Sequence, residues 1–495
     1  MPAPDHRRAP LVEGIHQYRE RGVLPFSTPG HKLGVGAGDD LRELLGADAL
    51  AADIPLGGGV DDTHFGGDTL RAAEDLGAAA WGADRAFYLV NGSSAGNHAY
   101  LLALLRPGDE VIVGRDIHKS LLVALILTGA NPIYVAPRLH PDLNVGLGVA
   151  AADVAVALAA HPAARLVVLV SPSYCGVASD VAAIAAVAHD HGVPLYVDEA
   201  WAPHVGFHLA LPASAMASGA DGAVISSHKL LAALTQSAVL LVRGDRVDHG
   251  RLATAVGMVL TTSPAATILA SIDACRRQMA LHGEALLDRT IALAADARRR
   301  LQAMPGVDVL DADRLGIAPG RYDPTKLVID VHCLGLTGFA AEHELRERYA
   351  VQPEMSDLVG VVCLVSLGDT AASVDRLVGA FADLAAERVG SAPTDAGADV
   401  RSSGAVLASG TPAISPRDAF FAPSLAVPLT DAVGAVSAEL VIPYPPGIPV
   451  LAPGDVVSAA AVAYLRHGAA HGMYLSGPED PTLATLRVVV GVGDR

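Results

Sequence analysis

Short apolar runs alternate with helix-like segments from about residue 83 onward. Seven runs have the length and composition of buried strands, at residues 85–90, 109–114, 131–136, 165–170, 194–199, 222–227 and 237–242. Helical segments separate several of them, for instance residues 179–192, where Ser179 or Asp180 can cap the start and Gly192 the end. This alternation predicts an α/β fold with a mostly parallel sheet between helices. Ligands bind beyond the carboxyl ends of such strands, so candidate functional residues should follow the strands.

The pattern changes after the last of these strands. A second α/β segment begins with a long Ala- and Arg-rich helix, and a stretch rich in Gly, Ser, Ala and Pro without periodicity follows it. We therefore expect five parts. They are an N-terminal arm at 1–45, a large domain at 46–285, a smaller α/β domain at 286–388, a flexible linker at 389–413 and a C-terminal domain at 414–495.

Composition narrows the possible partners and compartments. The chain has a formal net charge of −18 and therefore lacks the basic surface that binds nucleic acids or anionic membranes. Gly, Pro or charged residues interrupt the apolar stretches before about 18 residues, and the N-terminal stretch has no apolar core of a secretory signal. The four cysteines are widely spaced and form no metal-type pair. These features predict a soluble cytoplasmic protein without a metal site, a nucleic-acid partner or a membrane partner.

Lysine is rare in this chain. Of 35 lysines and arginines, only Lys32, Lys119, Lys229 and Lys326 are lysine. Lysine offers a chemistry that arginine lacks, because its amine can lose a proton and form a Schiff base with a carbonyl. Lys32 lies in the N-terminal arm, Lys119 adjoins His118, and Lys326 is expected in a polar "YDPTK" turn. Lys229, between "SSH" and an apolar run, is the predicted Schiff-base lysine.

Other polar residues follow the predicted strands. Ser93 and Ser94 of "NGSSAGN" open a helix whose free N–H groups can cradle a phosphate, His118 follows the strand at 109–114, and Asp198 ends the strand at 194–199. Each also has an ordinary structural interpretation. Ser93 and Ser94 could form a bare turn, His118 could be a hydrogen-bonded turn residue, and Asp198 could cap a nearby group. Together with Lys229 they supply what pyridoxal phosphate needs: a phosphate cradle, a flat cover for its ring, a partner for its ring nitrogen and an amine for its aldehyde.

Seven stretches, taken in order, resemble the motifs of the bacterial ornithine/lysine/arginine decarboxylases. They are "STPGHKLG", "NGSSAGN", "RDIHKS", "DEAWAPHVGFH", "SSHKLLAALTQ", "LTTSP" and "YPPGIPVLAPGD". The resemblance runs from about residue 24 to the C-terminus. It implies the type I, aspartate-aminotransferase-like fold and pyridoxal 5'-phosphate as cofactor.

The resemblance also implies roles around the cofactor ring. Lys229 would carry the cofactor and Asp198 would pair with the ring nitrogen. His118 would stack on one face, Ala200 would pack against the other, and Trp201 would lie near the O3′ edge. Lys229 or His228 would return a proton to the substrate.

Further positions follow from the same resemblance. The phosphate would be bound by Ser93, Ser94, Ala95, Ser226 and His228. Thr262 of "LTTSP" would reach the phosphate from the neighbouring subunit, which implies a homodimer with a shared active site, with a tetramer as the alternative. "TPGHK" begins at Thr28, so the receiver-like domain of the larger family members is expected to be missing.

The reaction that the resemblance implies is decarboxylation of a basic amino acid, with arginine giving agmatine as the favoured reading. Lysine giving cadaverine and ornithine giving putrescine are the alternatives on the substrate side. An aminotransferase, an aldolase-type lyase or a non-catalytic cofactor-binding regulator would share the cofactor residues. A cationic substrate side chain needs an acidic partner, for which Asp455, Glu439, Asp61 and Asp62 are candidates, each with a plain structural role as its alternative. Asp455 stands where the family usually has glutamate, and "GVDDTHFGGDT" matches its family segment loosely.

Overall fold

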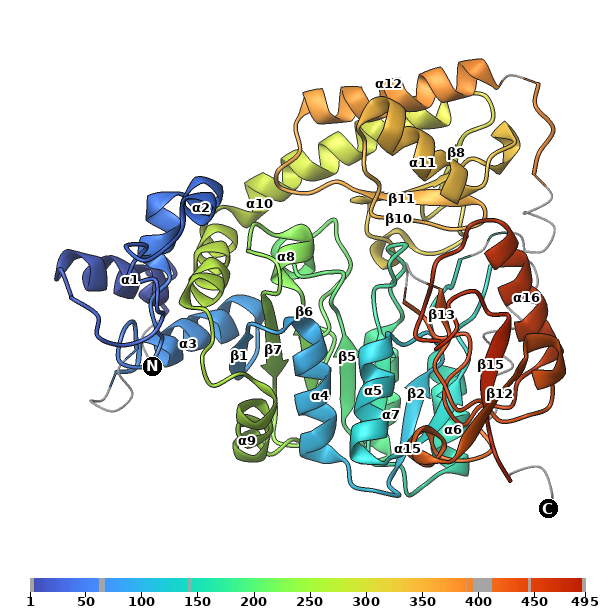
Figure 1. Cartoon of the computed structure of the whole chain (residues 1–495), viewed down its shortest axis with the longest axis horizontal. Helices are drawn as coiled ribbons and strands as arrows, with labels where there is room; N and C mark the ends of the chain where they lie inside the picture. Colours follow the sequence, from blue (N-terminus) through green and yellow to red (C-terminus); the bar gives the residue numbers. More distant parts are fainter. Residues whose placement is uncertain are drawn as a thin grey trace.

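The structure is a computed structural model that describes residues 4–61, 67–140, 143, 145–388, 390–394, 412–443 and 447–491. All seven predicted strands form, as β1 (Arg85–Leu89), β2 (Glu110–Gly114), β3 (Asn131–Val135), β4 (Val167–Val170), β5 (Leu195–Asp198), β6 (Gly222–Ile225) and β7 (Ala238–Val242). They make one sheet in the order β1-β7-β6-β5-β4-β2-β3. Only β7 runs antiparallel to its neighbours. The prediction of a mostly parallel sheet is confirmed (Figure 1).

Helices cover both faces of this sheet, which explains why its strands read as continuous apolar runs. On one face α4 (Gly92–Leu104), α5 (Lys119–Thr128) and α9 (His249–Val259) pack in a common core. On the other face lie α3 (Thr69–Trp81), α6 (Ala151–Ala160), α7 (Val181–Asp190) and the first turns of α10 (Ala266–Gln302). The predicted cap of α7 is confirmed, because the Asp180 side chain accepts a hydrogen bond from the Ala183 backbone N–H over 3.0 Å.

A second sheet lies above the first in Figure 1, reached through the 37-residue helix α10. It contains β8 (Asp308–Val309), β9 (Lys326–Asp330), β10 (Met355–Ser356) and β11 (Gly360–Leu364) in the antiparallel order β10-β11-β9-β8. Helices α11 (Gly338–Tyr349) and α12 (Ala371–Glu387) cover it. The expected division between residues 285 and 286 falls inside α10, which begins earlier than the predicted helix. The five-part division of the chain stays a prediction.

The two ends of the chain pack on opposite sides of the large sheet (Figure 1). The N-terminal part contains α1 (Pro10–Glu20) and α2 (Asp39–Ala52). The C-terminal part contains α15 (Pro416–Phe421), β12 (Ser424–Pro428), β13 (Ile442–Pro443), α16 (Ala459–Ala470), β14 (Leu475–Ser476) and β15 (Thr485–Val489). Most of the predicted linker, residues 389 and 395–411, lies outside the described residues. Within the described ranges, no helix combines the length and the apolar character needed to cross a membrane.

Candidate active site

A pocket opens where the parallel strands end, as the sequence predicts. Six predicted site residues line it: Ser93, His118, Asp198, Ala200, Trp201 and Lys229. The rest of the lining is Asp116, Val170, Ser173, Tyr174 and Ile448. These residues follow β1, β2, β4, β5 and β6 along the chain, apart from Ile448, which comes from the C-terminal part. The fold therefore brings the separated motifs to one edge of the sheet.

Lys229 loses its proton more easily than an ordinary lysine. It lies in α8 (Ser227–Leu230), a single turn directly after β6, and its Nζ is 3.6 Å from the centroid of the Trp201 ring. Burial lowers the pKa of Lys229 from 10.5 to about 8, although Asp198 and Glu354 act to raise it. A buried lysine with a lowered pKa is the form that attacks an aldehyde.

Asp198 is fixed from two sides at the end of β5. Its carboxylate is buried and accepts one hydrogen bond from Asn97 Nδ2 over 2.8 Å and another from the Ala200 N–H over 3.1 Å. Asn97 is itself oriented, because its Oδ1 accepts a hydrogen bond from the Tyr196 hydroxyl over 2.8 Å. With only these two donors, the Asp198 carboxylate still has lone pairs that can accept an N–H from a ligand.

His118 caps α5 with its side chain and shares a partner with Asn97. Its Nδ1 lies 2.9 Å from Ser120 Oγ, and Asn97 Nδ2 donates to the same oxygen over 2.8 Å. Burial lowers the pKa of His118 to about 4, and Lys229 contributes, while Asp198 opposes the shift. The imidazole is therefore uncharged at neutral pH and offers a flat face to the pocket.

The predicted phosphate residues surround the start of α4 and α8. Ser93 lines the pocket, whereas Ser94, Ala95, Ser226 and His228 lie outside its lining. Ser226 Oγ is buried and has no hydrogen-bond partner in the described part of the chain. The His228 ring donates from Nδ1 to the Ser237 carbonyl over 2.8 Å. A buried hydroxyl without a partner, near free N–H groups at a helix start, fits a phosphate.

Thr262 is placed differently from the other predicted residues. It is exposed in the turn between α9 and α10 and does not line the pocket of its own chain. The turn is held locally, since the Ser263 N–H donates to Thr261 Oγ1 over 3.2 Å. Thr262 is thus free to meet another molecule.

Three of the four predicted acidic partners of the substrate are engaged elsewhere. Asp61 accepts hydrogen bonds from the Thr69 and Leu70 N–H groups at the start of α3. Glu439 accepts hydrogen bonds from two backbone N–H groups of the C-terminal part, and Asp455 forms a buried ion pair with Arg115 over 2.8 Å. None of the three lines the pocket, and Asp62 lies outside the described residues.

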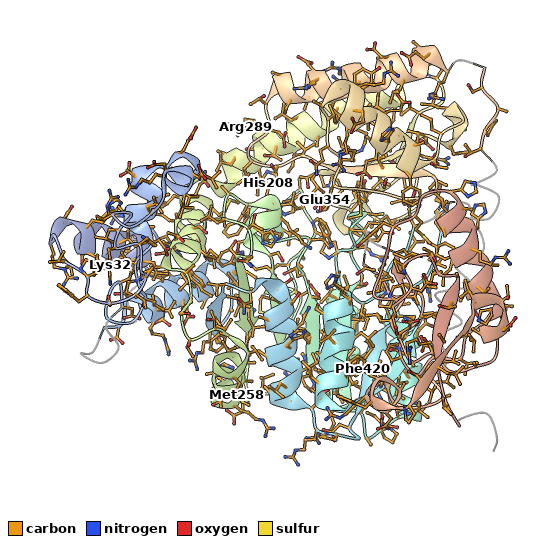
Figure 2. All side chains as sticks on the ribbon, in the orientation of Figure 1. Lys32, His208, Met258, Arg289, Glu354 and Phe420 are labelled. Carbon is orange, nitrogen blue, oxygen red and sulfur yellow. The ribbon has the colours of Figure 1, made fainter. Side chains whose placement is uncertain are left out.

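Two other carboxylates, which the sequence did not single out, bear on the site: one lines the pocket and the other acts electrostatically on Lys229. Asp116 lines the pocket with a buried Oδ1 that has no partner among the described residues, and burial raises its pKa to about 6. Glu354, labelled in Figure 2, immediately precedes β10; it is exposed and is not among the residues that line the pocket. Its charge acts to raise the pKa of Lys229. No pattern in the sequence marks these two carboxylates, because only the fold brings them near Lys229.

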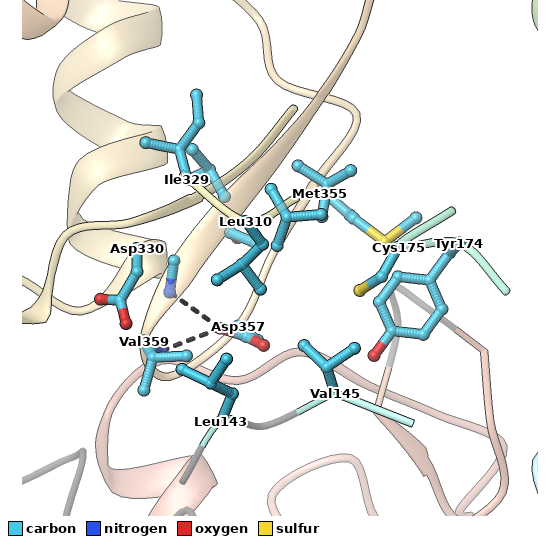
Figure 3. Close-up of a pocket in the computed structure, with 15 residues that line it drawn as sticks. Leu143, Val145, Tyr174, Cys175, Leu310, Ile329, Asp330, Met355, Asp357 and Val359 are labelled. Carbon is cyan, nitrogen blue, oxygen red and sulfur yellow. Dashed lines mark hydrogen bonds between the residues drawn. The ribbon is translucent and has the colours of Figure 1, made fainter. Parts of the chain in front are cut away.

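A second pocket adjoins the first through Tyr174 (Figure 3). Its walls are mostly apolar and come from the smaller sheet, with Tyr174 and Cys175 on the facing loop. Asp357 accepts hydrogen bonds from the Val359 and Gly360 N–H groups over 2.8 Å, and Asp330 accepts one from the His332 N–H over 2.9 Å. Since both of its carboxylates are already engaged, the candidate active site is the first pocket.

Comparison with known proteins identifies the family of this chain. Residues 9–373 match the family described as Orn/Lys/Arg decarboxylase, major domain, and residues 405–477 match its C-terminal domain. The chain is 40% identical to an arginine decarboxylase of Halalkalibacterium halodurans, over 97% of this chain and 98% of that protein. It is 37% identical to an arginine decarboxylase of Bacillus subtilis, over 97% of each chain. Lysine decarboxylase A from Pseudomonas aeruginosa has the same fold, with a TM-score of 0.82 and 22% identity over 97% of this chain and 80% of that one.

Proposed function

We infer that this chain, which belongs to the Orn/Lys/Arg decarboxylase family, is a pyridoxal phosphate-dependent enzyme that decarboxylates L-arginine to agmatine. The observation that carries the choice of arginine is the match to proteins named arginine decarboxylase over nearly their whole length. The lysine decarboxylase of the same fold is more distant, at 22% identity.

The residues of the pocket fit the cofactor. Lys229 Nζ would bond its aldehyde carbon, Asp198 would accept the N–H of its ring, and His118 would cover the ring. Ser93, Ser94 and Ala95 at the start of α4, with Ser226 and His228 near α8, would hold its phosphate, and Ala200 and Trp201 would complete the ring site. When bound, pyridoxal phosphate supplies the electron sink for the bond between Cα and the carboxylate.

The side chains contribute three things to the reaction. Asp198 is held in place by Asn97 and the Ala200 N–H, so its carboxylate would be oriented to accept the N–H of the ring. With a pKa of about 8, the amine of Lys229 can bind and release a proton near neutral pH, which suits a group that returns a proton to Cα. His228 is the alternative donor, although its Nδ1 is occupied by the Ser237 carbonyl.

We assign recognition of the substrate side chain to Glu354. It lies directly before β10 of the smaller sheet, and its charge acts on the pKa of Lys229. Burial and the nearby cationic side chains act on its pKa in opposite directions, with burial dominant. A carboxylate in this position can pair with a guanidinium in bidentate geometry.

We further propose that the enzyme works as a homodimer in the cytoplasm. Thr262 is exposed, as expected of a residue that reaches the phosphate of a second copy. Large apolar side chains of the N-terminal part are also exposed, including Leu24, Phe26, Val35 and Leu44, and a second copy would bury such a surface. Sedimentation of the cofactor-loaded protein tests this proposal: a dimer or a tetramer supports it, and a fully active monomer contradicts it.

The substrate is tested by comparing kcat/KM for L-arginine, L-lysine and L-ornithine with purified, cofactor-loaded protein. We expect arginine to give the highest value. A preference for lysine or ornithine would keep the reaction and overturn the assignment of the substrate.

A further inference from the structure

Lys326 is fully buried, whereas Lys229 is only partly buried. The predicted polar turn forms, since the Lys326 N–H donates to the Asp323 carbonyl over 3.2 Å, but the turn is enclosed by the protein. The lysine side chain is 0% exposed. The residue is the first of β9 in the smaller sheet. Nζ donates hydrogen bonds to Asp323 Oδ2 over 2.7 Å and to the Trp201 carbonyl over 2.9 Å. Trp201 is the residue whose ring lies beside Lys229 Nζ.

The partner of Lys326 is equally enclosed. Asp323 is 0% exposed, and its Oδ2 also lies 3.2 Å from Nε2 of the buried His204, three residues beyond Trp201. Burial opposes ionisation of Asp323, but Lys326 and His204 outweigh burial and hold the pKa of this carboxyl well below its usual range. The pair is therefore charged, and removing one partner would leave a buried charge uncompensated.

The same segment also holds the loop that follows β4. The Asp323 N–H donates to the Gly176 carbonyl over 2.8 Å. A Cβ on Gly176 would come within 2.9 Å of Lys326 Cγ, so the two backbones approach closely here. This loop carries Ser173 and Tyr174, and the loop after β5 carries Ala200 and Trp201. One charged cluster thus ties the smaller sheet to both loops that line the pocket.

We propose that Lys326 is a positioning residue: with Asp323 and His204 it fixes the Trp201 loop of the large domain against the smaller sheet, and so places the Trp201 ring beside Lys229. Removing Lys326 should have two effects. A loss of turnover rests on the proposed function, whereas a displacement of the Trp201 ring does not. An ordinary hydrophobic residue would fill the space but could not bind the Trp201 carbonyl.

Two variants distinguish a role in positioning Trp201 from a role in stabilising the fold. Lys326→Met removes the donor to Trp201 but leaves Asp323 unpaired, which can prevent folding. The double variant Asp323→Asn with Lys326→Met removes both charges and still lacks the donor. Arg276→Met is the matched control, because Asp273 and Arg276 form a pair with the same spacing and the same full burial on α10.

The first readout is the access of acrylamide to tryptophan in the cofactor-loaded protein. The chain has two tryptophans, of which Trp81 is buried and Trp201 is partly exposed, and Trp201→Phe identifies the share of the signal from Trp201. We expect stronger quenching of Trp201 in both Lys326 variants and no change in Arg276→Met. Unchanged quenching in a folded double variant would overturn the proposal.

The second readout is the split between kcat and KM. We expect the folded Lys326 variants to lose about 10- to 100-fold in kcat with a smaller change in KM, as for a misplaced ring next to the reacting group. An unchanged kcat, or an equal loss of kcat in Arg276→Met, would assign Lys326 a stabilising role only. If no tested amino acid is decarboxylated, the quenching result still decides the proposal.

Discussion

Asn97 Nδ2 donates a hydrogen bond to Asp198 Oδ2 over 2.8 Å, although the two residues are 101 positions apart. Tyr196, on the same strand as Asp198, fixes the other end of the Asn97 amide. The amide thus sets the orientation of the carboxylate that is proposed to meet the cofactor ring.

Asn97→Ala should weaken this arrangement. Loss of one hydrogen bond to a buried carboxylate costs about 1–3 kcal/mol, so we expect kcat/KM to fall about tenfold or more, with weaker retention of the cofactor. Asn131→Ala is the control, since Asn131 donates only to the Gly108 carbonyl far from the pocket. Equal activity and cofactor retention in both variants would refute the role of Asn97.

The lowered pKa of Lys229 predicts how the apoprotein takes up pyridoxal phosphate. The neutral amine reacts, so the rate should rise tenfold per pH unit below about 8 and level off above it. An ordinary lysine would level off only near 10.5. Stopped-flow measurement of the visible absorbance between pH 6 and about 10 would locate the midpoint. A midpoint near 10.5 would show that Lys229 is not perturbed.

Glu354→Gln should raise KM for arginine and leave kcat and thermal stability nearly unchanged. The charge of this carboxylate acts on Lys229, and we expect an increase in KM of about tenfold from the lost ion pair with the substrate. Glu347→Gln, an exposed change in α11 of the same sheet domain, is the control. An unaltered KM in Glu354→Gln would move the recognition of the side chain to another carboxylate, with Asp116 as the next candidate.

Asp455→Ala should act on stability and not on substrate choice. Asp455 pairs with Arg115, and both side chains are almost fully buried, at 1% and 2% exposed. Arg115 also donates to the carbonyls of Pro449 and Val450, so this contact anchors the C-terminal part beside β2. Removing one partner of a buried pair costs about 3–5 kcal/mol, which calorimetry should report as a lower unfolding temperature of the C-terminal part. A changed preference between arginine and lysine in the folded variant would instead return Asp455 to the substrate site.

The sequence predicted the large sheet because each strand is a continuous apolar run, which is the pattern of strands covered on both faces. It also predicted Lys229, Asp198 and His118 together, because parallel strands bring residues that follow them to one edge. Asn97 was missed, although it lies one helical turn beyond Ser93 on the same side of α4. Its function depends on Tyr196 and Asp198, which only the fold brings to it.

Lys326 and Glu354 show what the sequence could not predict. Lys326 ends the polar turn that the sequence predicted, but the sequence did not show that this turn is buried or that Asp323 is the partner of the lysine. Glu354 carries no signal in the sequence, because only the fold brings its charge near enough to act on Lys229. Local patterns report burial and strand ends well, but they carry no information about which distant groups compensate a charge.

The most direct test of the account is the stoichiometry of products from L-arginine, for the wild-type protein and for Lys229→Ala. The cofactor-loaded wild-type protein should release CO₂ and agmatine in equal amounts, and Lys229→Ala should release neither and lose the visible absorbance of the bound cofactor. Lys32→Ala, which changes a partly exposed lysine of the N-terminal part far along the chain from Lys229, should behave as the wild type. Undiminished CO₂ release by Lys229→Ala, or no CO₂ from a wild-type protein that retains the cofactor absorbance, would contradict the account.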